Sequence, residues 1–205
     1  MKILMIADNE EPKLWDDWSE DTKKGLADVG LILSAGDLDP DYLEFLVTML
    51  NVPLVYVRGN HDGIYDERPP KGCVDADGRI VEEAGLRILG LGGSMRYLPD
   101  APDMYTEEEM QKRIRPLRMK MAAGRLTGGR AFDILLTHAP CRGCGDMEDI
   151  PHRGFDCFNE LLEKYRPKLH CFGHVHQEYG HFKRTMDHPS GTVLVNACGY
   201  NIYEI

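Results

Sequence analysis

The sequence predicts an α/β fold in which a largely parallel or mixed β-sheet is covered by helices. Short apolar runs alternate with helical segments along most of the chain, which is typical of strand–helix–strand units. Polar residues directly follow five of these runs, as they do where the carboxyl ends of strands gather at one edge of a sheet. The 205 residues suffice for one substantial core, so we expect a single domain over 1–205.

The first half of the chain alternates three strands with two helices. An apolar run predicts a buried strand over Lys2–Ala7, and a helix is expected over 19–29. The next strand is expected over 31–34. A helix is expected over Pro40–Leu50, because proline is tolerated in a first helical turn. A third strand is expected over 54–57.

The second half continues the alternation with different sequences. Apolar runs there predict further strands, and longer segments of helical periodicity predict two helices. The strands are expected over Leu86–Leu91, 133–137, Leu169–Phe172 and 192–196, and the helices over 106–125 and 155–165.

Charge and hydropathy restrict the partners. The formal net charge is -10, and the largest basic cluster has the spacing of a solvated helix face, so no stable nucleic-acid complex is expected. We expect no membrane association, because no apolar run is long enough to span a bilayer. The first run also lacks a secretory cleavage signature, which predicts a cytoplasmic protein. Nothing in the sequence indicates the oligomeric state.

Six scattered cysteines without a secretory signal indicate reduced thiols rather than a disulfide framework. Cys141 and Cys144 form one CxxC pair. Such a pair is a zinc signal only when further Cys or His ligands lie nearby. We therefore interpret the two cysteines as small loop residues and keep a zinc site as the alternative.

Five of the expected strands end in residues that commonly bind metals. A single aspartate there would be a turn or cap residue, and a single histidine a hydrogen-bonded core residue. Five coincident ends indicate a shared site. Glycine, which permits tight turns, precedes three of the candidates, at Gly36, Gly59 and Gly173. The ends are Asp8, Asp37, Asn60-His61, His138 and His174-Val-His176.

In their order and spacing, these residues resemble the motifs of calcineurin-like metallophosphoesterases. The blocks that carry the resemblance are GDLDP at 36–40, GNHD at 59–62, THAP at 137–140 and GHVH at 173–176. The resemblance implies a four-layer α/β/β/α sandwich of two mixed β-sheets flanked by helices, with metals at one edge. It further implies a hydrolase of phosphomonoesters or phosphodiesters that uses a metal-bridging hydroxide at a dinuclear site.

The resemblance also implies a role for each matching residue. We expect two divalent ions, Mn²⁺ first, with Fe, Zn²⁺ or Mg²⁺ as alternatives. His61 would lie beside the metals and protonate the leaving oxygen, because an imidazole titrates near neutrality. Asp37 would bridge both metals, Asn60, His138 and His174 would complete one metal, and Asp8 and His176 would bind the other.

The first motif departs from the family pattern. The family has D-x-H where this chain has Asp8-Asn9-Glu10. In one interpretation Glu10 replaces the histidine as an oxygen ligand, which favours Mn²⁺ or Mg²⁺ over Zn²⁺ at that position. In the other, Glu10 points away and the first position is weak or empty. We expect the first interpretation, with Glu10 as a metal ligand, because every other ligand position is filled.

Further residues bear on the substrate and on an alternative function. The segment from Asp146 to Gly154 resembles the substrate-side loop of small bacterial members, so we expect His152 and Arg153 to contact a substrate phosphate. The substrate is expected to be a small phosphoester. The alternative to an enzyme is a catalytically weak or silent member that acts as a protein-binding scaffold, because the change at Glu10 leaves that function open.

Overall fold

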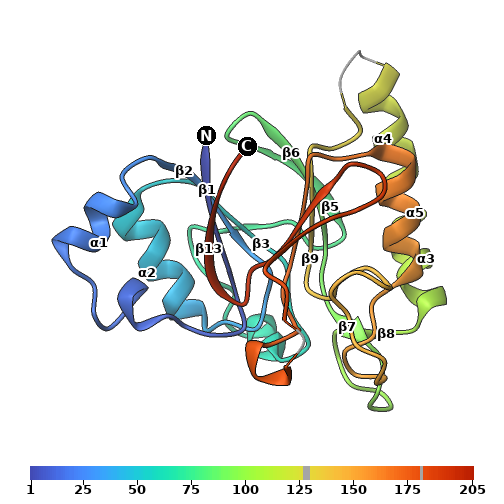
Figure 1. Ribbon diagram of the computed structural model, residues 1–205, viewed down its shortest axis with the longest axis horizontal. Helices are drawn as coiled ribbons and strands as arrows, with labels where there is room; N and C mark the ends of the chain where they lie inside the picture. The colour runs from blue at the N-terminus through green and yellow to red at the C-terminus, as the bar shows by residue number, and fades with distance from the viewer. Residues whose placement is uncertain (127–129, 181) are drawn as a thin grey trace.

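Two β-sheets pack face to face, and helices cover both outer faces (Figure 1). The computed structural model describes residues 1–126, 130–180 and 182–205. Within these ranges, the first sheet contains, in spatial order, β13 (Gly199–Glu204), β1 (Lys2–Ala7), β2 (Val29–Ser34), β3 (Leu54–Tyr56) and β4 (Val74–Asp75). The second contains β11 (Thr185–Asp187), β12 (Val193–Asn196), β10 (Leu169–Phe172), β9 (Ile134–Thr137), β6 (Leu86–Leu91) and β5 (Arg79–Glu83). A short parallel pair is formed by β7 (Ser94–Met95) and β8 (Met104–Tyr105).

The helices separate into two outer layers, one beside each sheet (Figure 1). The first layer is formed by α1 (Glu20–Gly25) and α2 (Pro40–Leu50), and the second by α3 (Glu107–Ile114), α4 (Leu117–Leu126) and α5 (Asp156–Tyr165). Short 3-10 turns are η1 (Pro12–Leu14), η2 (Asp62–Asp66) and η3 (Gln177–Tyr179). The expected α/β sandwich of two mixed sheets flanked by helices is thereby confirmed. None of the helices in the described ranges is long and apolar enough to cross a bilayer.

Three apolar cores hold the four layers together, and strand alternation assigns side chains to them. On β1, Ile3 and Met5 face the space between the sheets, whereas Leu4 faces the α1–α2 layer. On β9, Ile134 lies in the core between the sheets, and Leu135 packs with α5. Successive side chains of a strand point to opposite faces, so strands buried on both faces appear as unbroken apolar runs.

Two helix predictions were wrong in extent. The helix expected over 19–29 ends at Gly25, because Val29 already pairs with Lys2 as the start of β2. The helix expected over 106–125 is divided into α3 and α4 beside Pro116. Proline has no amide hydrogen to donate and its ring clashes with the preceding turn, which explains the break.

Candidate metal centre

The five predicted strand ends meet at one edge of the sandwich. β1, β2 and β3 run parallel in the first sheet, as do β9 and β10 in the second, so their carboxyl ends point the same way. They open onto a cavity of about 400 Å³. Its lining residues are Asp8, Asp37, Asn60, His61, Tyr97, Pro151, His152, His174, His176 and Tyr179.

Three of the candidate ligands have left-handed backbone. The φ angles are 63° at Asp8, 57° at Asp37 and 69° at His174. Residues other than glycine adopt this conformation at an energetic cost, and such residues concentrate at functional sites. The conformation turns each chain sharply as it leaves its strand, so that the side chain faces the cavity.

Glycines allow these loops to approach one another closely. Gly59 has no room for a Cβ, because that atom would overlap the Asp37 carboxylate and lie 2.7 Å from the Asp37 nitrogen. A Cβ on Gly173 would lie 2.6 Å from the Cβ of Ala7 and 2.8 Å from Oδ2 of Asp8. The glycines of the GN and GH motifs are therefore required by the packing of neighbouring loops around the carboxylates.

Three acceptor groups converge on one point in the buried part of the site. His138 Nδ1 donates to the Ala35 carbonyl at 2.8 Å, so the lone pair of a neutral ring lies on Nε2. That nitrogen is 3.1 Å from Asn60 Oδ1 and 3.4 Å from Asp37 Oδ2. Lone pairs that face one another repel unless a proton or a cation lies among them, so this donor set fits a metal ion.

The pKa shifts of His138 and Asp37 indicate that positive charge stabilises this arrangement. Burial opposes protonation of His138, but the adjacent Asp37 carboxylate raises its pKa to about 9. Burial also opposes ionisation of Asp37, yet His138 and the His61 amide hold the pKa of that carboxyl below its usual value. A bound cation would supply the same charge without a proton.

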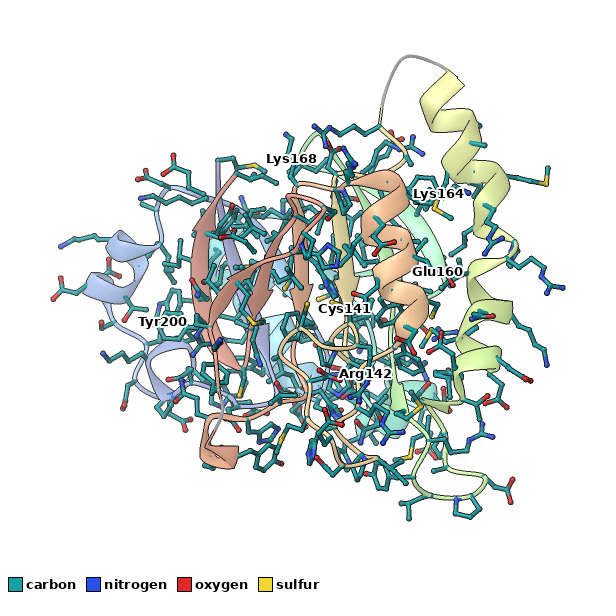
Figure 2. All side chains as sticks on the ribbon, turned by 45° about the vertical axis from the view of Figure 1, so that its right-hand side comes forward. Cys141, Arg142, Glu160, Lys164, Lys168 and Tyr200 are labelled. Atoms are coloured by element: carbon teal, nitrogen blue, oxygen red, sulfur yellow. The ribbon has the colours of Figure 1, made fainter. Side chains whose placement is uncertain are left out.

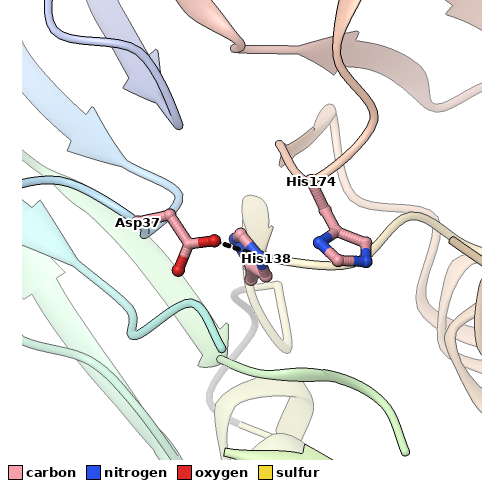
Figure 3. A group of neighbouring side chains, drawn as sticks. All are labelled: Asp37, His138 and His174. Atoms are coloured by element: carbon pink, nitrogen blue, oxygen red, sulfur yellow. Dashed lines mark ion pairs between the residues drawn. The ribbon is translucent and has the colours of Figure 1, made fainter. Parts of the chain in front are cut away.

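His174 completes a group of three side chains that could hold a metal ion. Figure 3 shows Asp37 and His138 side by side, with the His174 ring on the far side of His138. One ligand atom from each lies within 4.8 Å of the others. His174 Nε2 donates to the Pro151 carbonyl at 2.8 Å, which leaves Nδ1 to bind a metal. Burial, together with the nearby His138, lowers the pKa of His174 to about 3, so its ring is neutral.

Asp8 and His176 lie together at the adjoining position. The Asp8 carboxylate is fully buried and accepts from the His174 amide at 3.0 Å. His176 Nε2 lies 3.8 Å from Asp8 Oδ1, and its ring stacks on Tyr179. Burial raises the pKa of Asp8, and the nearby Asp37 carboxylate adds to this rise, while His138 and His176 oppose it.

Glu10 does not join this group. Its carboxylate accepts from the Asp39 amide at 3.2 Å, next to the N-terminus of α2, and Glu10 is exposed. Asp39 caps α2, because its side chain accepts from the Asp41 amide. In this arrangement Glu10 is directed toward the helix terminus and away from the cavity.

The remaining predicted residues occupy different places around the cavity. His61 lines it, and the His61 amide donates to Asp37 Oδ1 at 2.8 Å. His152 also lines it and pairs with Asp149 at 2.6 Å. Arg153 donates to the Glu148 carbonyl at 3.1 Å and is not brought into contact with the cavity.

A residue with no assigned role joins two of the loops. Asp62 Oδ2 accepts from the Asp37 amide at 2.8 Å and from the Gly59 amide at 2.7 Å. Burial, opposed by these amides and reinforced by Asp37, raises the pKa of Asp62 to about 6. The GNHD block, which ends at Asp62, is the sequence signal that could have identified it.

The CxxC pair lies apart from this group. Cys141 is buried and Cys144 is half-buried, and both are free thiols. Figure 2 shows Cys141 and Arg142 on the loop after β9, below the helix that carries Glu160 and Lys164. Among the described residues, the cysteines do not belong to a group of three metal-ligating side chains.

Comparison with known proteins agrees with this geometry. A family model for calcineurin-like phosphoesterases matches residues 1–178, and the chain belongs to that family. Two Caenorhabditis elegans proteins match short segments. UPF0046 protein T07D4.2 is 44% identical over 50 residues, which are 23% of this chain and 13% of that protein. UPF0046 protein C25E10.12 is 38% identical over 55 residues, which are 24% and 20%. The matches therefore span a small part of these relatives.

Solved structures of low sequence identity are also similar. Vps29 from Chaetomium thermophilum is 16% identical with a TM-score of 0.40, over 97% of this chain and 71% of Vps29. A novel archaeal phosphodiesterase is 13% identical with a TM-score of 0.44, over 100% of this chain and 93% of the other.

Proposed function

We propose that this protein is a metal-dependent phosphoesterase that hydrolyses a small phosphomonoester or phosphodiester at a dinuclear site. The observation that carries the proposal is the convergence of Asn60 Oδ1 and Asp37 Oδ2 on His138 Nε2, at 3.1 and 3.4 Å, beside an open cavity that Asp37 and Asn60 line. Membership of the calcineurin-like phosphoesterase family supports it.

The chain would hold the two cations in unequal environments. Asp37, Asn60, His138 and His174 offer one position two imidazoles, an amide oxygen and a carboxylate. Asp8 and His176 offer the other position fewer ligands, with Asp37 shared between the two. Divalent cations supply charge neutralisation for the phosphate and activation of water. Mn²⁺ is the ion we expect first, because a mixed oxygen and imidazole set suits it.

His61 is the proposed proton donor to the leaving oxygen. Its backbone amide is fixed on Asp37 while its side chain lines the cavity. The fixed amide restrains the position of the ring at the cavity, which supports this role. His152 lines the same cavity and remains a proposed substrate contact. Arg153, which bonds a backbone carbonyl, could reach a phosphate only after that bond is broken.

The two interpretations of Glu10 predict different numbers of tightly held metal ions per chain. Its bond to the Asp39 amide supports the interpretation in which the Asp8–His176 position is weak. Metal analysis after dialysis then yields close to one tightly held ion per chain, unchanged in Glu10→Ala. Two tightly held ions, of which Glu10→Ala loses one, would instead identify Glu10 as a ligand.

The hydrogen bond between Glu10 and the Asp39 amide also supports the alternative function as a protein-binding scaffold. A weakly held metal ion at the Asp8–His176 position would reduce the rate of hydrolysis. Hydrolysis of bis-p-nitrophenyl phosphate and p-nitrophenyl phosphate with added Mn²⁺, Mg²⁺ or Zn²⁺ separates the two functions. We expect turnover that is lost in Asp37→Asn and His138→Ala. A folded sample that is inactive toward both esters with every metal would favour the scaffold.

A further inference from the structure

We propose that the site selects monoanionic phosphodiesters with an aromatic ester group over dianionic phosphomonoesters. This inference rests on the proposed function and names its substrate class. It is carried by two independent features of the cavity, namely the charge of its lining and the aromatic and apolar residues around it.

The first feature is the lack of permanently charged cations in the described part of the lining. Among the described residues that line the cavity, none is lysine or arginine. Sites that bind a terminal phosphate usually add arginine or lysine, because a dianion with three free oxygens needs charge-assisted donors beyond the metals. Here the lining offers imidazoles, an amide, carboxylates and tyrosines.

The arginines that lie near the cavity along the chain are bonded to other groups. Three of them stand within two residues of a lining residue along the chain, so the backbone places them close enough to turn inward. Each is bonded elsewhere: Arg58 pairs with Asp66, Arg96 with Glu109 and the Met104 carbonyl, and Arg153 with the Glu148 carbonyl. A guanidinium held in this way would have to break these bonds to reach a substrate phosphate.

Arg142, on the loop that also carries Pro151 and His152, shows the same arrangement. It forms ion pairs with Asp146 at 2.7 Å and with Glu148 at 2.9 Å. Its charge is therefore compensated within the loop. A diester has one negative charge and two free oxygens, so it needs less positive charge from the protein than a monoester does.

The second feature is the set of aromatic and apolar residues in the lining. Tyr97, Pro151 and Tyr179 line the cavity. Tyr179 lies against His176 at 5.2 Å with nearly parallel rings and against His152 at 4.6 Å, while Tyr179 itself is 40% exposed. A continuous ring surface thus extends from a metal-ligand candidate outward to solvent. Such a surface stacks with planar groups.

Three exposed apolar residues lie close in the sequence to residues that line the cavity. Leu98 follows Tyr97, Ile150 precedes Pro151, and Ile64 lies three residues after His61. All three are between 50 and 53% exposed. Exposed apolar side chains beside a polar cavity are typical of a binding site for a ligand with an apolar part. The organic group of the substrate would occupy this rim while its phosphate lies over the metal ligands.

Binding of three compounds that cannot be hydrolysed tests the inference directly. Diphenylphosphinate is a monoanion with two rings, phenylphosphonate is a dianion at pH 8, and dimethylphosphinate is a monoanion without rings. We expect calorimetry on the Mn²⁺-loaded protein to give a Kd for diphenylphosphinate about tenfold or more below that of either other compound. A Kd for phenylphosphonate equal to or lower than that of diphenylphosphinate would overturn the charge argument. Equal Kd values for the two phosphinates would overturn the aromatic argument.

Variants assign the preference to particular residues. Tyr179→Ala should weaken diphenylphosphinate binding about tenfold and leave dimethylphosphinate unchanged, because stacking is lost. Tyr179→Phe retains the ring and should bind like the wild type. Met119→Ala, at a position 81% exposed on α4, is the matched control away from the cavity. Equal loss for both phosphinates in Tyr179→Ala would indicate a merely structural role and contradict the proposal.

Tyr97→Arg tests the charge argument in the opposite direction. A guanidinium at the cavity should lower the Kd of phenylphosphonate about tenfold relative to diphenylphosphinate, because charge-assisted hydrogen bonds favour the dianion. Failure of the proposed function is a separate outcome, seen as absent turnover of every phosphoester. In that case the comparison of Kd values still decides which class of phosphorus compound the cavity binds more tightly.

Discussion

Replacing Asp62 by asparagine should make the metal-free protein more stable at neutral pH. Asp62 is 3% exposed and its two backbone hydrogen bonds end on the same oxygen, Oδ2. An asparagine carbonyl can accept both bonds. Asp62→Asn therefore retains the connection between the Asp37 and Gly59 loops while it removes a buried negative charge.

The magnitude follows from the pKa. Burial raises the pKa of Asp62 from 3.8 to about 6, and about two pKa units correspond to about 3 kcal/mol. Because the folded-state pKa is the higher one, the favourable contribution of Asp62 is complete below pH 3.8 and is lost as the pH rises through 6. The stability difference between variant and wild type should therefore develop between about pH 4 and pH 6 and then remain constant.

Urea denaturation in the presence of a chelator measures this difference at a series of pH values. At pH 8 we expect Asp62→Asn to exceed the wild type by up to about 3 kcal/mol, and at pH 4 by much less. Asp62→Ala is the matched control. It removes the charge and both hydrogen bonds, so it should be less stable than Asp62→Asn by about 2 kcal/mol. A difference between Asp62→Asn and wild type that does not change with pH would refute the reasoning.

Three further predictions concern the loops around the cavity. Gly59→Ala should destabilise the protein by about 1 to 3 kcal/mol, measured by urea denaturation, and weaken metal binding, because its Cβ overlaps the Asp37 carboxylate. Asp39→Ala should lower the free energy of unfolding by about 1 kcal/mol through loss of the α2 cap, with unchanged metal content by elemental analysis. His61→Asn should lower kcat about 10²-fold or more while metal content stays at the wild-type value, because its amide still bonds Asp37. Loss of metal in His61→Asn would contradict the proposal that His61 donates a proton without binding metal.

The strands that carry the site could be predicted because each is buried on both faces. An unbroken apolar run such as Lys2–Ala7 is recognisable without knowledge of its neighbours. Strand β13, in contrast, mixes apolar and polar residues without an unbroken apolar run, and its antiparallel pairing with β1 defines it. β5 is a charged strand that pairs with β6 at the edge of the second sheet. Partners far away in the chain determine both strands, so local sequence does not reveal them.

The site was predictable to a similar extent. Ligand-type residues follow strands, and that order alone placed Asp37 and His138 together. The direction of the Glu10 side chain was not predictable, because it depends on the free amide of Asp39 at the α2 terminus. Tyr97 reaches the cavity from a loop that carries no motif, and Tyr179 from the 3-10 turn η3 that follows the GHVH block. Their contribution depends on loop conformation, for which the sequence contains no periodic signal.

Metal binding by the wild type and His138→Ala tests the central claim most directly. His138 is fully buried, and its Nε2 is the point on which the Asp37 and Asn60 oxygens converge. Calorimetric titration with Mn²⁺ should show a tight site in the wild type that is weakened at least about 100-fold in His138→Ala. Circular dichroism should confirm that the variant is folded. A folded His138→Ala protein that binds Mn²⁺ as tightly as the wild type would contradict the account.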